Sequence, residues 1–111
     1  MGLYKKAKAV KTSEKEVLKA CLEYLELRGY MAWRNNSGAY KTPEGRLVRF
    51  GKAGSPDIIG LTKEGRFIGI ECKSDTGILS DWQKAHRDMV IKNKGLYVLA
   101  RSIEDLQEAG L

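Results

Sequence analysis

The chain has 111 residues, of which 42% are hydrophobic and 31% are charged. This composition indicates one globular domain and excludes a disordered chain, and no apolar run approaches the ~18 residues that span a bilayer. Lys and Arg outnumber Asp and Glu by 20 to 14, a net charge of +6 that favours a polyanion such as nucleic acid as partner. Charge alone leaves open a basic surface without such a partner.

The first twelve residues form a basic segment, which we expect to be a loose N-terminal arm. Residues 13–111 then form the single folded domain. The arm lacks the apolar core of a signal peptide, so we expect a cytoplasmic protein with no membrane association. Four lysines of the arm are candidate contacts to DNA: Lys5, Lys6, Lys8 and Lys11.

Residues 14–28 show the apolar period of an amphipathic helix. Thr12 or Ser13 can cap its first turn. The apolar stripe consists of Val17, Leu18, Cys21, Leu22 and Leu25.

Three short strands are predicted after this helix. They cover residues 30–34, 46–50 and 58–61. Residues 35–45, between the first two strands, are turn-forming throughout, and a glycine-rich loop precedes the third strand.

The second half of the chain adds two more strands and two helices. Residues 67–73 pair with residues 58–61 in a hairpin, and residues 96–100 form an apolar strand. A helix over residues 80–93 separates these strands, and a short helix follows Ser102. This order predicts an α/β fold with a mixed central sheet flanked by helices.

The helix at residues 80–93 carries one apolar stripe, formed by Trp82, Ala85 and Met89. We expect Trp33 and Trp82 to anchor the core rather than to stack on bases. The lone histidine, His86, is expected to pack or to lie on the surface.

Two carboxylates and an amine converge in the central hairpin. Alternation along its second strand puts Glu71 and Lys73 side by side on one face, with Cys72 facing the core. Asp57, at the start of the neighbouring strand, can reach the same place. Converging carboxylates repel unless a cation lies between them, and such oxygen ligands suit Mg²⁺. Lys73 can orient an attacking water or stabilise charge on a phosphate.

Each part of this pattern also has an ordinary structural interpretation. An exposed Glu-x-Lys pair is usually a solvated salt bridge worth ~0–1 kcal/mol, and Pro-Asp is common where a loop enters a strand. Their joint occurrence on hairpin partners in a basic chain favours a functional site. The two cysteines, Cys21 and Cys72, are predicted to be buried thiols and not a disulfide.

Pro56-Asp57, thirteen intervening residues and then Glu71-Cys72-Lys73 match the PD-(D/E)xK nuclease pattern. Four segments, RNNSG, GSPDIIG, GRFIGIECK and GILSDWQ, occur in order from residue 34 to residue 83. In these segments the chain resembles the VRR-NUC family, the virus-type replication-repair nucleases that are often free-standing in phages. The resemblance covers roughly residues 14–101.

The resemblance implies a metal-dependent nuclease with a restriction-endonuclease-like core. In that family the metal is held by the Asp, the Glu, the next backbone carbonyl and an acid of the first helix. The first three correspond here to Asp57, Glu71 and the Cys72 carbonyl, and a nearby Gln corresponds to Gln83. Mg²⁺ is the expected cofactor, and Mn²⁺ is expected to substitute for it.

Two carboxylates of the first helix are candidates for the remaining ligand, Glu14 and Glu16. Glu14 precedes Val17 and Leu18 by three and four residues, on the inward stripe, whereas Glu16 leads to a more exposed face. Helical spacing therefore favours Glu14. Its alternative role is that of a first-turn acid stabilising the helix dipole.

Gln83 has an alternative role as well, because Ser80-Asp81-Trp82-Gln83 is a capping box in which the Gln side chain reaches back to Ser80. We expect the two roles to compete for one amide. A polar loop could hold phosphate or the strand backbone of DNA, although a plain turn is the alternative. Its residues are Arg34, Asn35, Asn36 and Ser37.

We therefore expect a DNA endonuclease that is selective for branched DNA, like a Holliday-junction resolvase, in phage DNA replication or repair in the host cytoplasm. Small free-standing members resemble archaeal junction resolvases, which are two-fold dimers, so a homodimer is expected. Two alternatives are a flap or nicking nuclease and a non-catalytic DNA-binding module. Intact Asp57, Glu71 and Lys73 argue against the second alternative.

Overall fold

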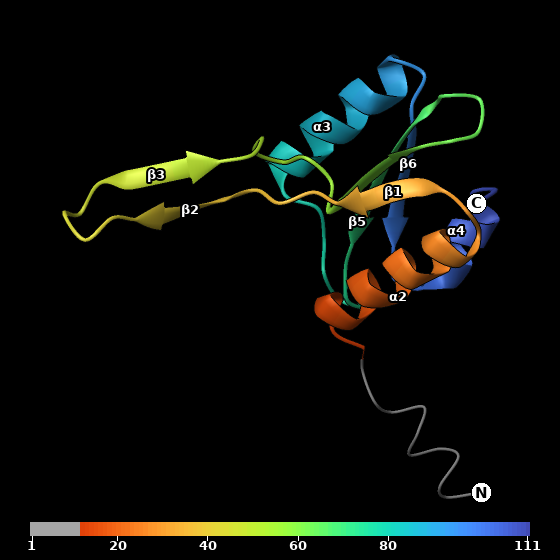
Figure 1. Cartoon of the computed structure of the whole chain (residues 1–111), viewed down its shortest axis with the longest axis horizontal. Coiled ribbons are helices and arrows are strands. Elements are labelled where there is room, and N and C mark those ends of the chain that lie inside the picture. The colour runs from red at the N-terminus through yellow and green to blue at the C-terminus, as the bar shows by residue number, and fades with distance from the viewer. Residues whose placement is uncertain (1–11) are drawn as a thin grey trace, which may run out of the picture.

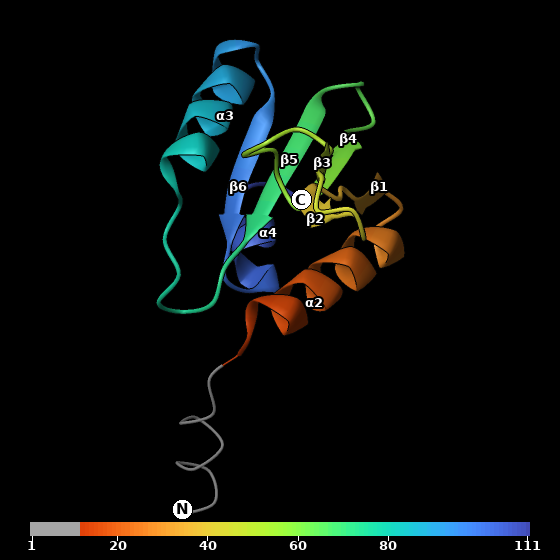
Figure 2. The same ribbon diagram turned by 90° about the vertical axis from the view of Figure 1, so that its left-hand side faces the viewer.

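The computed structural model describes residues 12–111 and contains a four-stranded sheet with helices on both faces (Figure 1 and Figure 2). The strand order is β1-β4-β5-β6, with antiparallel pairing up to β5 and a parallel β5–β6 pair. A parallel pair needs a crossover connection, which a helix supplies here. The strands are β1 (Met31–Arg34), β4 (Ile58–Leu61), β5 (Phe67–Cys72) and β6 (Leu96–Ala100).

Three helices flank this sheet. α2 (Glu14–Leu27) and α4 (Ile103–Glu108) cover one face, and α3 (Asp81–Lys92) packs on the other face against β5 and β6 (Figure 2). The predicted α/β fold with a mixed central sheet is therefore confirmed. Within residues 12–111, every helix is too short or too polar to cross a membrane. The four lysines proposed for the N-terminal arm lie outside the described residues.

The main core lies between the sheet and the helices α2 and α4. Ser13 caps α2 in a capping box with Glu16, which fixes where the helix begins. Both cysteines are buried, as predicted, and both are free thiols in this structure. The buried residues of this core are Val17, Cys21, Leu25, Ile58, Ile68, Ile70, Cys72, Val98, Ala100, Leu106 and Leu111.

A second, two-stranded sheet projects from the body as a hairpin (Figure 1). It pairs β2 (Gly38–Lys41) with β3 (Leu47–Phe50) in antiparallel register. The strand predicted at residues 46–50 is confirmed, but the prediction of turns throughout residues 35–45 is wrong. The segment GAYK has too little alternation to indicate a strand by itself, and it becomes one because β3 supplies its hydrogen-bond partners.

The prediction that Trp33 and Trp82 anchor the core is also wrong, since they are 47% and 69% exposed. α3 turns a different stripe toward the sheet, on which Val90 is buried and Gln83 is half-buried. Apolar periodicity alone selected the wrong side of this helix, because the inward side carries polar groups.

Candidate active site

Asp57 is fixed at the end of the sheet where β4 begins. Gly69 of β5 leaves room for the preceding proline, since a Cβ there would lie 2.8 Å from Pro56 Cγ. Asn35 holds the same turn, because its amide donates to the Pro56 carbonyl at 2.9 Å and its N–H donates to the Asp57 carbonyl at 2.7 Å. The Cys72 N–H donates to Asp57 Oδ2 at 2.8 Å. The carboxylate is therefore held against the end of β5.

Glu71 is the buried acid of the site, with 3% of its surface exposed. Ile58 pairs with Ile70 in the β4–β5 ladder, so the next positions along the strands bring Asp57 and Glu71 together. Glu71 Oε1 accepts a hydrogen bond from Gln83, whereas the buried Oε2 has no partner within residues 12–111. Burial, and then the Asp57 carboxylate, raise the pKa of Glu71 to about 8.

Gln83 both completes the predicted capping box and contacts Glu71. Its Oε1 accepts the Ser80 N–H at 2.8 Å and completes the capping box of α3. Its Nε2 donates to Glu71 Oε1 at 2.9 Å. The expected competition for one amide is therefore wrong, because the two ends of the amide serve the two partners separately.

Lys73 and Glu14 border the carboxylate pair. Lys73 Nζ lies 3.9 Å from Glu14 Oε1, with Lys73 the more buried partner. Glu16 points elsewhere, because its carboxylate accepts from Ser13 in the α2 capping box. The structure thus brings Glu14, and not Glu16, to the site. Glu14 and Asp57 also line one open pocket of about 420 Å³.

The carboxylates form a pair rather than a complete cage for a cation. Within residues 12–111, no three His, Cys, Asp or Glu side chains converge closely enough to make a metal-binding cluster by themselves. Mg²⁺ commonly takes only one or two protein carboxylates and fills its shell with water and substrate phosphate. The unpartnered Oε2 of Glu71 and its repulsion from Asp57 fit such a cation.

The polar residues 34–37, at the end of β1 and just after it, fall into two groups: Asn35 is bonded within the protein, and the other three are exposed. The Asn35 amide donates to both Ser55 Oγ and the Pro56 carbonyl, so its hydrogen atoms are engaged within the protein. This residue positions the Asp57 turn, a role that the sequence did not reveal. Arg34, Asn36 and Ser37 are exposed near the same end of the sheet and stay candidates for DNA contact.

Tyr97 is a neighbour on the Glu71 face of the sheet that sequence reasoning missed. It pairs with Gly69 on β6, and its hydroxyl is buried without a partner in residues 12–111. Burial, together with the charge of Glu71, raises the pKa of this phenol. Strand alternation contained the signal, since position 97 shares the Glu71 face once β5 and β6 are paired. His86 is half-buried on α3, where burial lowers its pKa.

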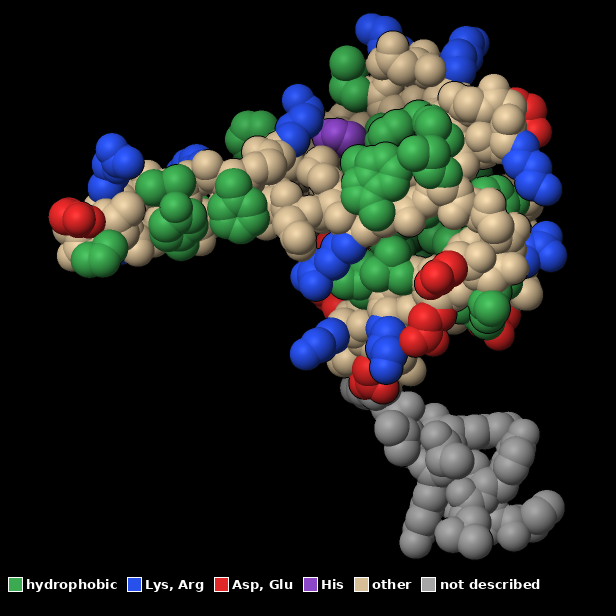
Figure 3. Space-filling view, viewed as in Figure 1, with side chains coloured by type: hydrophobic (Ala, Val, Ile, Leu, Met, Phe, Trp, Pro, Cys, Tyr) green, Lys and Arg blue, Asp and Glu red, His purple; other side chains and the backbone are tan. Residues whose placement is uncertain are grey.

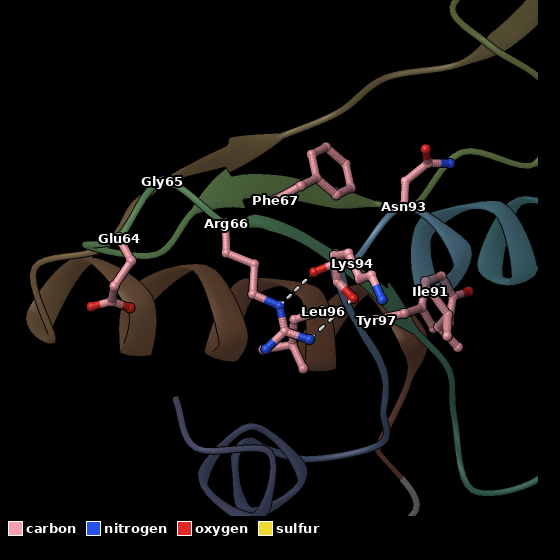
Figure 4. Close-up of a pocket in the computed structure, with 10 residues that line it drawn as sticks. Glu64, Gly65, Arg66, Phe67, Ile91, Asn93, Lys94, Leu96 and Tyr97 are labelled. Carbon is pink, nitrogen blue, oxygen red and sulfur yellow. Dashed lines mark hydrogen bonds between the residues drawn. The ribbon is translucent and has the colours of Figure 1, made fainter.

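A large surface hollow lies at the opposite end of the sheet from the carboxylates (Figure 4). There the Arg66 guanidinium donates to the carbonyls of Lys94 at 2.7 Å and Gly95 at 3.3 Å. These bonds tie the β4–β5 turn to the turn before β6. The hollow therefore lies away from the carboxylate site.

Comparison with protein families matches the VRR-NUC domain over residues 12–104. The chain therefore belongs to the VRR-NUC family, and it is a nuclease that acts on DNA. Neither the curated proteins nor the solved structures gave a match.

Proposed function

We propose that this nuclease is a divalent-metal-dependent endonuclease selective for branched DNA, with Mg²⁺ as cofactor and Mn²⁺ as a substitute. One observation carries the metal dependence. Asp57 and Glu71 are held together by the fold, yet Glu71 Oε2 is buried without a hydrogen-bond partner among residues 12–111. Two ionised carboxylates at this distance repel each other, so ionisation of Glu71 beside the half-buried Asp57 favours a cation between them, and hydrolysis of a phosphodiester uses one.

Each residue of the site has a role in this proposal. Asp57, Glu71 and the Cys72 carbonyl hold the cation, which supplies Lewis-acid chemistry at the phosphate when it is bound. Glu14 adds a ligand directly or through water. Lys73 positions the attacking water or stabilises charge on the phosphate.

Gln83 keeps the Glu71 carboxylate oriented by donating to Oε1, which leaves Oε2 available to a cation. The hydrogen bond comes from the first turn of α3, whose own cap is made by the same side chain. The orientation of Glu71 is therefore coupled to the start of α3.

A homodimer is supported by an uncovered apolar surface. Met31 and Trp33 of β1 are exposed, as are Trp82 and Met89 of α3. Figure 3 shows hydrophobic side chains gathered on the face of the body that carries β1. Exposed apolar patches mark interaction sites, and a two-fold dimer can place one site on each of the paired strands of a junction. We further propose that the protein acts in phage DNA replication or repair.

The test is a cleavage panel with the pure protein in Mg²⁺ or Mn²⁺. The substrates are a four-way junction, a flap, a nicked duplex and a plain duplex of matched sequence. We expect paired cuts in the junction and little cutting of the plain duplex, with Asp57→Asn inactive on all substrates. Preferred cutting of the flap or of the nicked duplex would favour the alternative nuclease. No cutting in either metal would favour a non-catalytic DNA-binding module.

A further inference from the structure

The β2–β3 hairpin carries positive charge that nothing in the folded body neutralises. Residues 38–50 contain three basic residues and one acidic residue, a net charge of +2. None of the three makes an ion pair with a carboxylate within residues 12–111. The basic residues are Lys41, Arg46 and Arg49, and the acidic residue is Glu44.

One face of the hairpin is apolar and packs on itself. Tyr40 pairs with Val48 and Gly38 pairs with Phe50, so these residues share a face. The Tyr40 and Phe50 rings lie 6.4 Å apart between centroids, and the Phe50 ring lies over Gly38. This pair of rings packs across the two strands and helps to stabilise the hairpin.

The other face of the hairpin is basic. Ala39 pairs with Arg49 and Lys41 pairs with Leu47, so Lys41 and Arg49 are diagonal neighbours on this face. Both side chains are exposed. Like charges at neighbouring cross-strand positions repel and destabilise a sheet unless an anion lies between them. This face therefore has the charge of a phosphate-binding surface.

The base of the hairpin is fixed at the end of the sheet that carries the active site. Gly51 has a φ of +71°, and a Cβ there would lie 2.4 Å from the Asn36 carbonyl oxygen. The two chain segments thus touch where the hairpin begins. Arg34, just before this point, pairs with Ile58, next to Asp57. DNA held by the carboxylates therefore lies near the base of the hairpin.

We propose that the β2–β3 hairpin is a DNA-binding arm, in which Lys41 and Arg49 contact phosphates of the duplex that flanks the cleavage site. This inference rests on the DNA-cleaving function proposed above. Lys41 lies three residues beyond Gly38 at the base of the hairpin, which is roughly 10 Å at ~3.3 Å per residue. Because DNA rises about 3.4 Å per nucleotide along each strand, this distance corresponds to about three base pairs from the base of the hairpin.

The test measures DNA binding, separately from cleavage, in the Asp57→Asn background by fluorescence anisotropy over a salt series. Lys41→Ala/Arg49→Ala should weaken binding on the order of tenfold or more at 0.1 M salt. The log–log salt slope should fall by about 0.9 for each phosphate that the variant no longer neutralises. The matched control is Lys63→Ala/Lys92→Ala, which removes the same charge from exposed positions outside the hairpin. The control should bind like the parent.

Two results would overturn the proposal that the hairpin binds DNA. One is equal affinity and equal salt slope for the hairpin variant and its control, with both folded by circular dichroism. The other is that Tyr40→Ser/Phe50→Ser changes the mass in light scattering while Lys41→Glu/Arg49→Glu leaves DNA affinity unchanged, which would make the hairpin a protein interface. Failure of the wild-type protein to cleave any DNA would overturn the proposed function alone, because arm-dependent binding is measured without cleavage.

Discussion

Glu71 is buried beside Asp57, so ionising it costs more in the folded chain than in the unfolded chain. Its folded pKa of about 8 lies above the ordinary value of 4.5, and the folded state therefore keeps a proton that the unfolded state releases. In metal-free protein this contribution to stability is complete below about pH 4.5 and is lost as the pH rises toward 8. The free energy of unfolding should fall by at most ~1.4 kcal/mol per pH unit. Urea unfolding in EDTA at a series of pH values would measure this slope.

The control for this pH effect is Glu71→Gln, which cannot ionise and should flatten the profile between about pH 5 and pH 8. Adding Mg²⁺ to the wild-type protein should flatten it as well, since a cation favours the ionised carboxylate. An unchanged slope in the Gln variant would assign the pH dependence to other groups.

Lys73 gives a second prediction at the scale of the residue. Because Lys73 is proposed to act on water or phosphate and not to bind the cation, Lys73→Ala should lower turnover by roughly 10²-fold or more. The shift in melting temperature on adding Mg²⁺ should persist or grow, since the ammonium no longer repels the cation. Lys63→Ala is the matched control. Disappearance of the Mg²⁺ shift together with activity would instead show that Lys73 builds the metal site.

At the scale of the element, the first turn of α3 joins helix stability to the active site through Gln83. Ser80→Ala removes the cap but leaves the Gln83–Glu71 hydrogen bond, and should cost ~1 kcal/mol of unfolding free energy with activity kept. Gln83→Ala removes the hydrogen bond from the Ser80 N–H and the hydrogen bond to Glu71. This variant should lose a similar unfolding free energy and should also have lower turnover. Equal turnover in the two variants would show that Gln83 is only a cap.

The elements also show how far sequence reasoning reaches. β4 and β5 were predictable because each is an apolar run bounded by turn residues, and their register placed Asp57 beside Glu71. β2 was not predictable, since GAYK becomes a strand only through pairing with β3. The orientation of α3 was not predictable either, because Trp82 dominates its apolar pattern while Gln83 faces the sheet.

The charged residues of the candidate site were predictable from the sequence, whereas the residues around them were less so. Asp57, Glu71 and Lys73 followed from strand alternation, and the choice of Glu14 followed from helical spacing. The positions of these surrounding residues depend on pairing between segments that are distant in the sequence. Asn35, just after β1, donates to Pro56, just before the neighbouring strand β4, and Tyr97 joins the Glu71 face only once β6 has paired in parallel with β5.

At the scale of the whole molecule, the proposed dimer predicts how mixed subunits behave. Wild-type protein combined with excess Lys73→Ala should form heterodimers that hold one competent site each, provided that subunits exchange. Such heterodimers should nick one strand of a junction and rarely complete the paired cut, because each strand needs its own site. The measurement compares nicked and fully resolved products, with exchange confirmed by a tagged subunit.

The alternative outcomes of this mixing experiment separate two architectures. If paired cutting only falls in proportion to dilution after exchange is confirmed, each protein molecule cuts independently and the two-site dimer is wrong. Light scattering gives the second readout, since a monomer both free and on DNA would leave the apolar surface of Met31, Trp33, Trp82 and Met89 without a second copy to cover it. A single catalytic site per DNA complex cannot make two symmetric cuts at once, so a monomer would favour flap or nicking cleavage over junction resolution.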